Sequence, residues 1–321
     1  YHFFFQERKI EMIPKIDLLK DENFEMKLHF HSCRMSIINS LRRIILSEVP
    51  SLAFDQIWFC KNTGVMNEDM LAHRISMIPL CCPNIEMLKF PEECSCEFGC
   101  RNCEIEYFLN VKNTQGESEM GVYCSDLKTA KNSNIVKYTN RENQKGILLT
   151  RLSKNQELQL KAKAIKGIGG QHSKWSSTNV CHFQKQKDGS VIFHVEVNQN
   201  ANCIDVVKKA AEILYKKLEM LSTKIHMYHT EDDSYEVPFD DTVLNILIDY
   251  MIENYDNLSV CFYKRGHFLQ DTKSKIVFHN NENNFTLEEK NIMIRTTIHI
   301  IQSTIHFLEC SLNKIKWGVD M

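Results

Sequence analysis

Two long helices, each with a single apolar face, are the clearest pattern of hydrophobic and polar positions in the chain. In residues 207–221 and 294–315, apolar side chains recur at alternating steps of three and four. A capping box of Thr286 and Glu289 starts the second helix. Burying such a stripe stabilises a fold by roughly 10–20 kcal/mol gross, so each face is expected to pack against another surface. The stripes consist of Val207, Ala211, Leu214, Leu218 and Leu221, and of Ile294, Ile298, Ile301, Ile305, Leu308, Leu312 and Ile315.

A third amphipathic helix is predicted upstream of Pro50, which ends it. Arg42 and Arg43 lie on the flank of this helix, and the spacing alone favours a solvated role for both. The apolar residues at helical spacing are Ile37, Ile38, Leu41, Ile44 and Ile45.

Between the helices, short runs of β-branched and aromatic residues predict strands, and the fold class is therefore mixed α+β. Asn-rich, charged segments at 112–119, 128–146 and 280–285 are expected to be surface loops. The predicted strands lie within residues 27–32, 51–60, 104–111, 190–197, 258–265 and 275–280.

Composition narrows the class of protein. The chain has 321 residues, of which 43% are hydrophobic and 25% charged, with a formal net charge of −2, which argues against disorder and against a broadly basic nucleic-acid binder. No run of eighteen apolar residues could span a membrane, and the opening YHFFF is too short for a signal peptide. We expect an intracellular protein whose thiols stay reduced.

One cysteine cluster is predicted to bind metal. Cys94, Cys96, Cys100 and Cys103 have the spacing C-x-C-x₃-C-x₂-C, which can place four thiolates around one structural Zn²⁺ ion. An iron–sulfur cluster uses the same ligands and is the alternative. Cys81 and Cys82 are expected to be packing residues. The remaining cysteines are interpreted as small buried side chains: Cys33, Cys60, Cys124, Cys181, Cys203, Cys261 and Cys310.

The charge around this cluster argues against binding to phosphate. Five glutamates surround the single Arg101, and four thiolates leave bound zinc with a negative charge. A structural zinc ion contributes on the order of 10 kcal/mol to folding, so the cluster is expected to brace a loop region. The glutamates are Glu92, Glu93, Glu97, Glu104 and Glu106.

Motifs for catalysis were not found in the sequence. H-E-x-x-H, G-x-S-x-G and a complete P-loop do not occur, and the histidines are scattered along the chain. Phe239, Asp240 and Asp241 are interpreted as a helix cap rather than a Mg²⁺ site. The basic stretch from Lys161 to Trp175 could contact nucleic acid, but docking on another polypeptide is favoured.

Four strings, in order, carry a family resemblance. NSLRRIILSEVPSLAFD at 39–55, NEDMLAHRISMIPL at 67–80, the cysteine cluster, and GIGGQHSKWSS at 167–177 closely resemble the third-largest subunit of eukaryotic and archaeal RNA polymerase, which is related to the bacterial alpha subunit. Residues 239–279 are similar to the small RPB11-like partner of that subunit, although Asp241 and Leu244 depart from its pattern. A fusion of the two partners suggests a polymerase of a large DNA virus.

The resemblance implies a particular domain organisation. Two alpha-like dimerisation domains would be related by a pseudo-twofold axis, with their long helices packed across it. The first would comprise residues 1–55 with 184–222, and the second residues 223–321. A β-rich, zinc-binding domain at 56–183 would be inserted in the first. There are two alternatives. Each apolar stripe could pack within the core of its own domain, or two copies of the chain could pair with each other.

The implied function is assembly. The chain would be a non-catalytic subunit of DNA-directed RNA polymerase, present in one copy, on which the largest and second-largest subunits and small RPB10-like and RPB12-like subunits assemble. DNA and RNA would be contacted only indirectly. A viral protein would act in the host cytoplasm and the virion, and a cellular one in the nucleus. The alternatives are a free-standing zinc-dependent transcription or interaction factor and a metalloenzyme with an open site.

Residues within the resembling strings are assigned to partner binding. Arginine pairs well with carboxylates and backbone carbonyls at interfaces, which favours such a role for Arg42, Arg43 and Arg74. In the alternative, the arginines are solvated or only brace the core. The complete set is Asn39, Leu41, Arg42, Arg43, His73, Arg74, His172, Lys174 and Trp175.

Overall fold

In the computed structural model, the chain forms two compact units. Unit 1 contains residues 1–45, 180–196 and 203–321, and unit 2 contains residues 46–179 and 197–202. The structure describes residues 14–22, 24–80, 82, 84–97, 99–114, 118–129, 146–198, 201–230, 234–238, 241–255, 260–264, 274–279 and 286–316.

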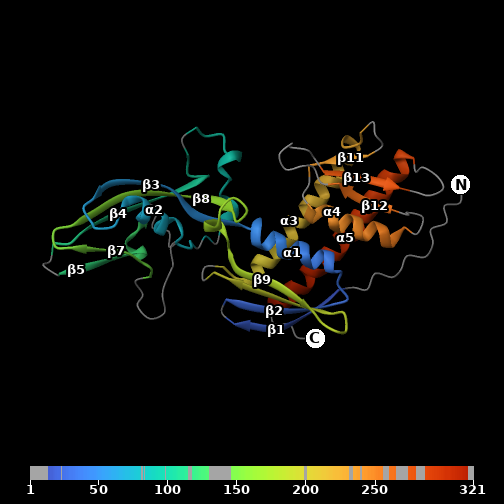
Figure 1. The fold of residues 1–321 in the computed structure, drawn as a ribbon, viewed down its shortest axis with the longest axis horizontal. Coiled ribbons are helices and arrows are strands. Elements are labelled where there is room, and N and C mark those ends of the chain that lie inside the picture. Colours follow the sequence, from blue (N-terminus) through green and yellow to red (C-terminus); the bar gives the residue numbers. More distant parts are fainter. Residues whose placement is uncertain are drawn as a thin grey trace. The chain divides into compact units, whose positions relative to one another are not determined.

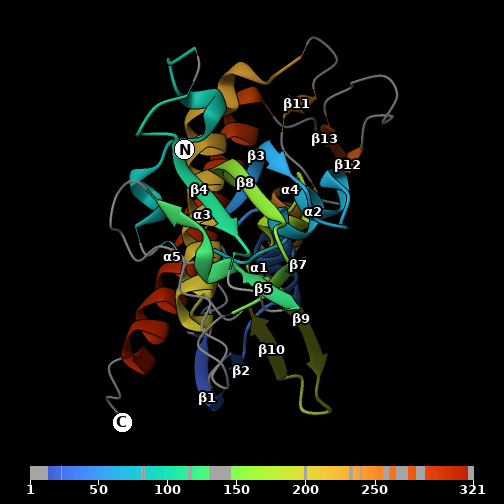
Figure 2. The same cartoon turned by 90° about the vertical axis from the view of Figure 1, so that its left-hand side faces the viewer.

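A four-stranded antiparallel sheet in the order β1-β2-β10-β9 forms one part of unit 1 (Figure 2). Side chains of β2 alternate, so that Met26, Leu28 and Phe30 are buried while Lys27, His29 and His31 lie on the outer face. Helix α3 packs on β2, and α1 lies along the same side of the sheet (Figure 1). The bounds are β1 Lys15–Glu22, β2 Glu25–His31, α1 Met35–Ser47, β9 Thr178–Lys185, β10 Val191–Val197 and α3 Cys203–Lys224.

The rest of unit 1 is a smaller sheet with two helices. Strands follow the order β11-β13-β12, and α4 and α5 pack against each other beside them (Figure 1). The capping box predicted for α5 is present, because the Thr286 amide donates to Glu289 Oε2 at 2.8 Å and the Glu289 amide donates to Thr286 Oγ1 at 3.3 Å. The bounds are η5 Ile225–Met227, β11 Tyr235–Val237, α4 Asp241–Asn254, β12 Val260–Lys264, β13 Ser274–His279 and α5 Leu287–Lys316.

The two predicted apolar stripes lie in the core of unit 1. All residues named for them are buried except Ile315, which is half-buried, and α3 packs directly against α5. Residues on both sides of the predicted boundary at 222 therefore share one compact unit. Among the described helices, none combines the length and apolar character of a membrane span.

Unit 2 is built on the long antiparallel pair β3 and β8, extended to the order β3-β8-β4-β6, with a separate pair β5-β7. Leu71 and Ile75 of α2 pack into the core with Phe54 and Tyr107, whose rings lie 5.0 Å apart. The strand bounds are β3 Pro50–Asn62, β4 Glu104–Lys112, β5 Glu119–Tyr123, β6 Lys128–Thr129, β7 Leu148–Ser153 and β8 Glu157–Ile168. The helical bounds are α2 Glu68–Ser76, η1 Ile85–Met87, η2 Pro91–Glu93, η3 Cys124–Asp126 and η4 Ser173–Trp175.

Each predicted strand run corresponds to a strand of the structure, namely β2, β3, β4, β10, β12 and β13. The predicted loops at 112–119 and 128–146 are partly wrong, since β4 ends at Lys112 and β6 covers Lys128–Thr129. Most of 128–146, all of 280–285, and Phe239, Asp240 and Cys81 lie outside the described residues.

Candidate metal centre

The predicted cysteine ligands converge in the segment that joins η2 to β4. The Sγ–Sγ distances are 3.3 Å between Cys94 and Cys96, 3.6 Å between Cys94 and Cys100, and 3.5 Å between Cys96 and Cys103. Tetrahedral zinc with Zn–S bonds of about 2.3 Å holds its sulfurs about 3.8 Å apart. The cluster can therefore hold a metal ion with little rearrangement.

The surroundings of the cluster act differently on its sulfur atoms. Gly99 adopts φ +89, a left-handed conformation suited to glycine, and brings the two cysteine pairs together. The Cys100 amide donates to Cys103 Sγ at 3.3 Å. A hydrogen bond from the backbone of Cys96 lowers the pKa of Cys94 to about 7, whereas desolvation raises the pKa of Cys103 to about 12, so a cation is needed to hold that sulfur as a thiolate.

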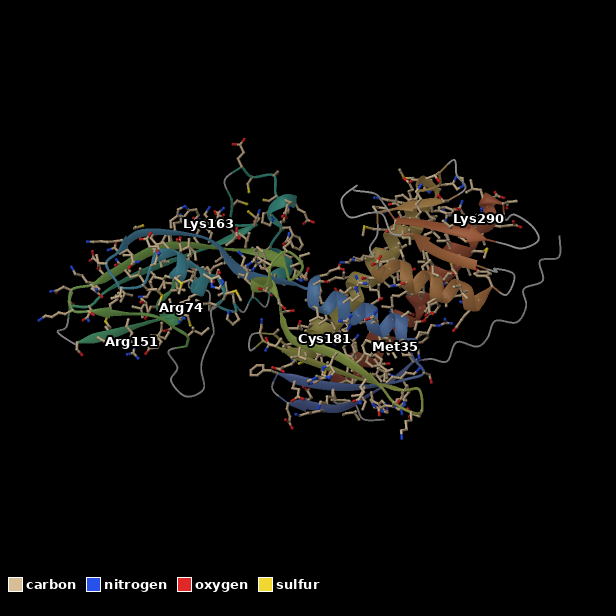
Figure 3. All side chains as sticks on the ribbon, viewed as in Figure 1. Met35, Arg74, Arg151, Lys163, Cys181 and Lys290 are labelled. Atoms are coloured by element: carbon tan, nitrogen blue, oxygen red, sulfur yellow. The ribbon has the colours of Figure 1, made fainter. Side chains whose placement is uncertain are left out.

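The acidic surroundings are partly neutralised, contrary to the charge balance expected from the sequence. Lys163 Nζ lies 2.8 Å from Glu104 Oε1, and Lys161 Nζ lies 2.6 Å from Glu106 Oε1. Both lysines project from β8 toward β4 and come from the basic stretch (Figure 3 labels Lys163). Only Glu92, Glu93 and Glu97 of the predicted acidic set remain exposed.

The other lysines of the basic stretch also make contacts within unit 2. Lys166 is buried and its Nζ donates to the Leu88 carbonyl at 3.1 Å. Lys174 Nζ lies 2.6 Å from Asp55 Oδ1. The ammonium groups of both lysines are thus held by contacts within unit 2.

Two further predicted partner-binding residues hold η4 in place. Trp175 is 8% exposed, and its indole N–H donates to the Ile165 carbonyl at 3.1 Å. His172 Nδ1 accepts a hydrogen bond of 3.1 Å from the Lys174 amide. The contacts fix the loop against β8, and a role for these residues in partner binding stays a prediction.

On α1, the predicted docking residues include an organised pair. Asn39 Oδ1 accepts hydrogen bonds from Arg42 Nε at 3.2 Å and from Arg42 Nη2 at 3.0 Å. Arg43 is half-buried. Leu41 lies in the core at 2% exposure, so it can support a docking surface only from beneath.

On α2, the two predicted residues differ. Arg74 donates through Nε to the Leu149 carbonyl at 3.2 Å and through Nη2 to the Leu148 carbonyl at 2.7 Å, which braces α2 against β7 (Figure 3). His73 is exposed. The bracing role that the sequence left open is present for Arg74, and docking through His73 stays a prediction.

The interpretation of the other cysteines is correct for Cys124, Cys181 and Cys203, which are buried. It is wrong for Cys60 and Cys310, which are exposed. Cys33 is partly buried, and the side chain of Cys261 lies outside the described residues.

Among the described residues, one further group could hold a metal ion, formed by Asp17, His29 and His31 on unit 1. Sequence reasoning missed it because the histidines were regarded as scattered. The available signal was the His-x-His pattern within a predicted strand, since alternate residues of a strand share a face.

Comparison with known proteins found similarity to subunits of RNA polymerase. Residues 57–183 match the model described as RNA polymerase Rpb3/RpoA insert domain. The chain is similar to DNA-directed RNA polymerase II subunit RPB3 of Schizosaccharomyces pombe, with 38% identity over 156 residues, which is 47% of this chain and 52% of that protein. The chain is thus similar to RPB3-type subunits of RNA polymerase. The candidate metal centre lies inside the RPB3/RpoA-like insert match.

Archaeal relatives give the same result. The chain is 34% identical to subunit Rpo3 of Methanosphaera stadtmanae over 149 residues, which is 46% of this chain and 53% of the relative. It is 28% identical to Rpo3 of Archaeoglobus fulgidus over 208 residues, which is 64% of this chain and 72% of the relative. The chain thus spans about half the length of the first curated relatives it matches.

Proposed function

We propose that this chain is a non-catalytic assembly subunit of a multisubunit DNA-directed RNA polymerase. The observation that carries the proposal is the insert-domain match over residues 57–183, together with relatives named RPB3 and Rpo3. In this function the largest and second-largest subunits assemble on the chain, with RPB10-like and RPB12-like subunits beside them. The chain itself supplies recognition and no catalytic group.

The proposal assigns structural Zn²⁺ to Cys94, Cys96, Cys100 and Cys103. Sulfur separations of 3.3–3.8 Å support a tetrahedral four-thiolate site. Four protein ligands leave no open position for water, so the ion would brace the loop before β4 rather than perform chemistry.

We further propose that residues 223–321 are a fused RPB11-like partner, related to the first half by a pseudo-twofold axis. Packing of α3 against α5 supports this idea, because each half contributes one long helix with a buried stripe. A second contact joins α1 to α4, where the buried Ser40 Oγ donates to the Thr242 carbonyl at 3.0 Å.

Arg34 strengthens the contact between α1 and α4. Its guanidinium lies 3.9 Å from the centroid of the Tyr250 ring, and its Nη2 lies 2.6 Å from Glu253 Oε2. Ser36 adds a hydrogen bond to Asp249. Such a fusion places the partner at high effective concentration, which predicts one copy of the chain per polymerase.

The docking surface for the large subunits is proposed to include Arg42 and Arg43 on α1, and Asn39 holds the first of these arginines in a defined orientation. A large DNA virus as the source, with transcription in the host cytoplasm, is proposed together with the fusion.

Co-expression of the tagged chain with the two large subunits of its own source tests the proposal. We expect the wild-type chain to recover a complex with the two large subunits. We expect Arg42→Glu/Arg43→Glu to recover no such complex. Lys216→Glu/Lys224→Glu is the matched control, because it makes the same charge change at exposed positions of α3. Circular dichroism of the isolated variants checks that both are folded. Equal recovery with both variants would contradict the assigned surface, and no complex with the wild-type chain would contradict the assembly function.

A further inference from the structure

The outer face of the β1-β2-β10-β9 sheet holds a group of potential metal ligands separate from the cysteine cluster. His29 and His31 are alternate residues of β2, and Asp17 lies opposite His29 on β1. The ring centroids of His29 and His31 are 4.0 Å apart, and His31 Nε2 lies 2.9 Å from Asp17 Oδ2. One ligand atom from each of the three residues lies within 4.8 Å of the others.

The donor set identifies the kind of ion. Two imidazoles and one carboxylate suit Zn²⁺ and other divalent first-row transition metals, whereas Ca²⁺ and Mg²⁺ prefer oxygen ligands throughout. Nitrogen and oxygen ligands bound to tetrahedral zinc at about 2.0–2.2 Å are about 3.3–3.6 Å apart, so small side-chain movements would complete such a site.

A second layer of hydrogen bonds orients His29 in the way metal-binding histidines require. Ser190 Oγ donates to Asp188 Oδ1 at 2.7 Å, and it lies 2.7 Å from His29 Nε2. Because the hydroxyl proton is directed to Asp188, Ser190 accepts from His29 Nε2–H. In the neutral ring, Nδ1 then carries the free lone pair, and a metal-binding histidine commonly donates its other nitrogen in this manner.

The two carboxylate oxygens of Asp17 face different neighbours. Lys15 approaches Oδ1 at 3.5 Å from an exposed position, while Oδ2 faces His31. The carboxylate oxygen nearest the histidines is thus directed toward the group.

We propose that Asp17, His29 and His31 bind one divalent transition-metal ion, with Zn²⁺ as the probe for the site. The ion would replace the proton shared by His31 and Asp17 and would link β1, an edge strand with a single buried side chain, to β2. Three protein ligands leave one position for water or a ligand from another molecule.

Calorimetric titration of Zn²⁺ into the full chain, with the cysteine cluster filled beforehand, tests this. The wild-type chain is expected to bind one additional equivalent. His29→Gln/His31→Gln should bind it at least 100-fold more weakly, and Ser190→Ala about 10- to 100-fold more weakly through loss of the oriented ring. With Co²⁺ as a second probe, the added ion should give visible bands without sulfur charge transfer.

The matched control is His182→Gln/His194→Gln. These histidines lie on β9 and β10, with ring centroids 4.7 Å apart, and His194 Nε2 lies 3.0 Å from Glu25 Oε1. Their substitution should leave binding of the additional zinc equivalent unchanged. Circular dichroism of each variant checks that it is folded. The proposal is overturned if the wild-type chain takes no additional equivalent at 100 µM Zn²⁺, if His29→Gln/His31→Gln binds normally, or if the control pair abolishes binding.

Discussion

Truncation of Ile301 should destabilise the parts of unit 1 before and after residue 222 together, because α5 packs on α3 and α4. Ile301 is fully buried, as are Ile298 and Ile305 on the same stripe. Ile301→Ala removes three carbon atoms, which at about 0.8 kcal/mol for each buried CH₂ loses about 2.4 kcal/mol. The cavity left behind raises the expected loss to about 3–4 kcal/mol.

Hydrogen exchange with peptide-resolved mass spectrometry measures this loss in each half separately. Since about 1.4 kcal/mol corresponds to a factor of ten, the slowest amides should exchange about 100- to 1,000-fold faster. We expect this increase in β2 and α3 as well as in α4 and α5, because the stripes of α3 and α5 share one core.

Ile292→Ala is the matched control on α5. Ile292 is 59% exposed, so its truncation should change stability by less than about 0.5 kcal/mol. Faster exchange in Ile301→Ala that is confined to residues 241–316, with β2 and α3 unchanged, would refute the shared core and favour two independent domains.

Two other predictions follow from the metal centre and from the start of α5. Cys96→Ser should lower the total zinc content by one equivalent in elemental analysis, whereas Cys60→Ser, at an exposed position outside the cluster, should leave it unchanged. Iron instead of zinc in the wild-type chain would contradict the zinc assignment. The backbone hydrogen bond from Thr286 lowers the pKa of Glu289 below its ordinary value of 4.5. The ionised carboxylate therefore stabilises the folded chain fully above pH 4.5, and this contribution is lost as the pH falls through the lowered pKa. Glu289→Gln should therefore lower Tm at pH 7 but converge with the wild-type chain in acid, and a constant difference in Tm across this range would contradict the role of the charge.

Features that depend on local spacing were predictable from the sequence. The stripes, the capping box and the cysteine cluster each depend on the spacing of residues within one short segment of the chain. The structure contains all three. The third helix also forms as predicted, from Met35 to Ser47.

Features that depend on strand register were not predictable. β1 buries only Ile16, so its sequence carries no alternation that would have revealed the strand or the approach of Asp17 to His29. Pairing of Lys163 with Glu104 likewise requires the register of β8 against β4. The alternation of lysine and alanine within β8, in contrast, indicates a strand with one buried face.

Affinity purification of the chain from its native source, followed by native mass spectrometry, tests the assembly function most directly. The proposal predicts one copy of this chain in a stable complex with two very large chains and smaller subunits, and template-dependent RNA synthesis only by that complex. Recovery of the chain alone, of two copies per complex, or of RNA synthesis by the isolated chain would contradict it.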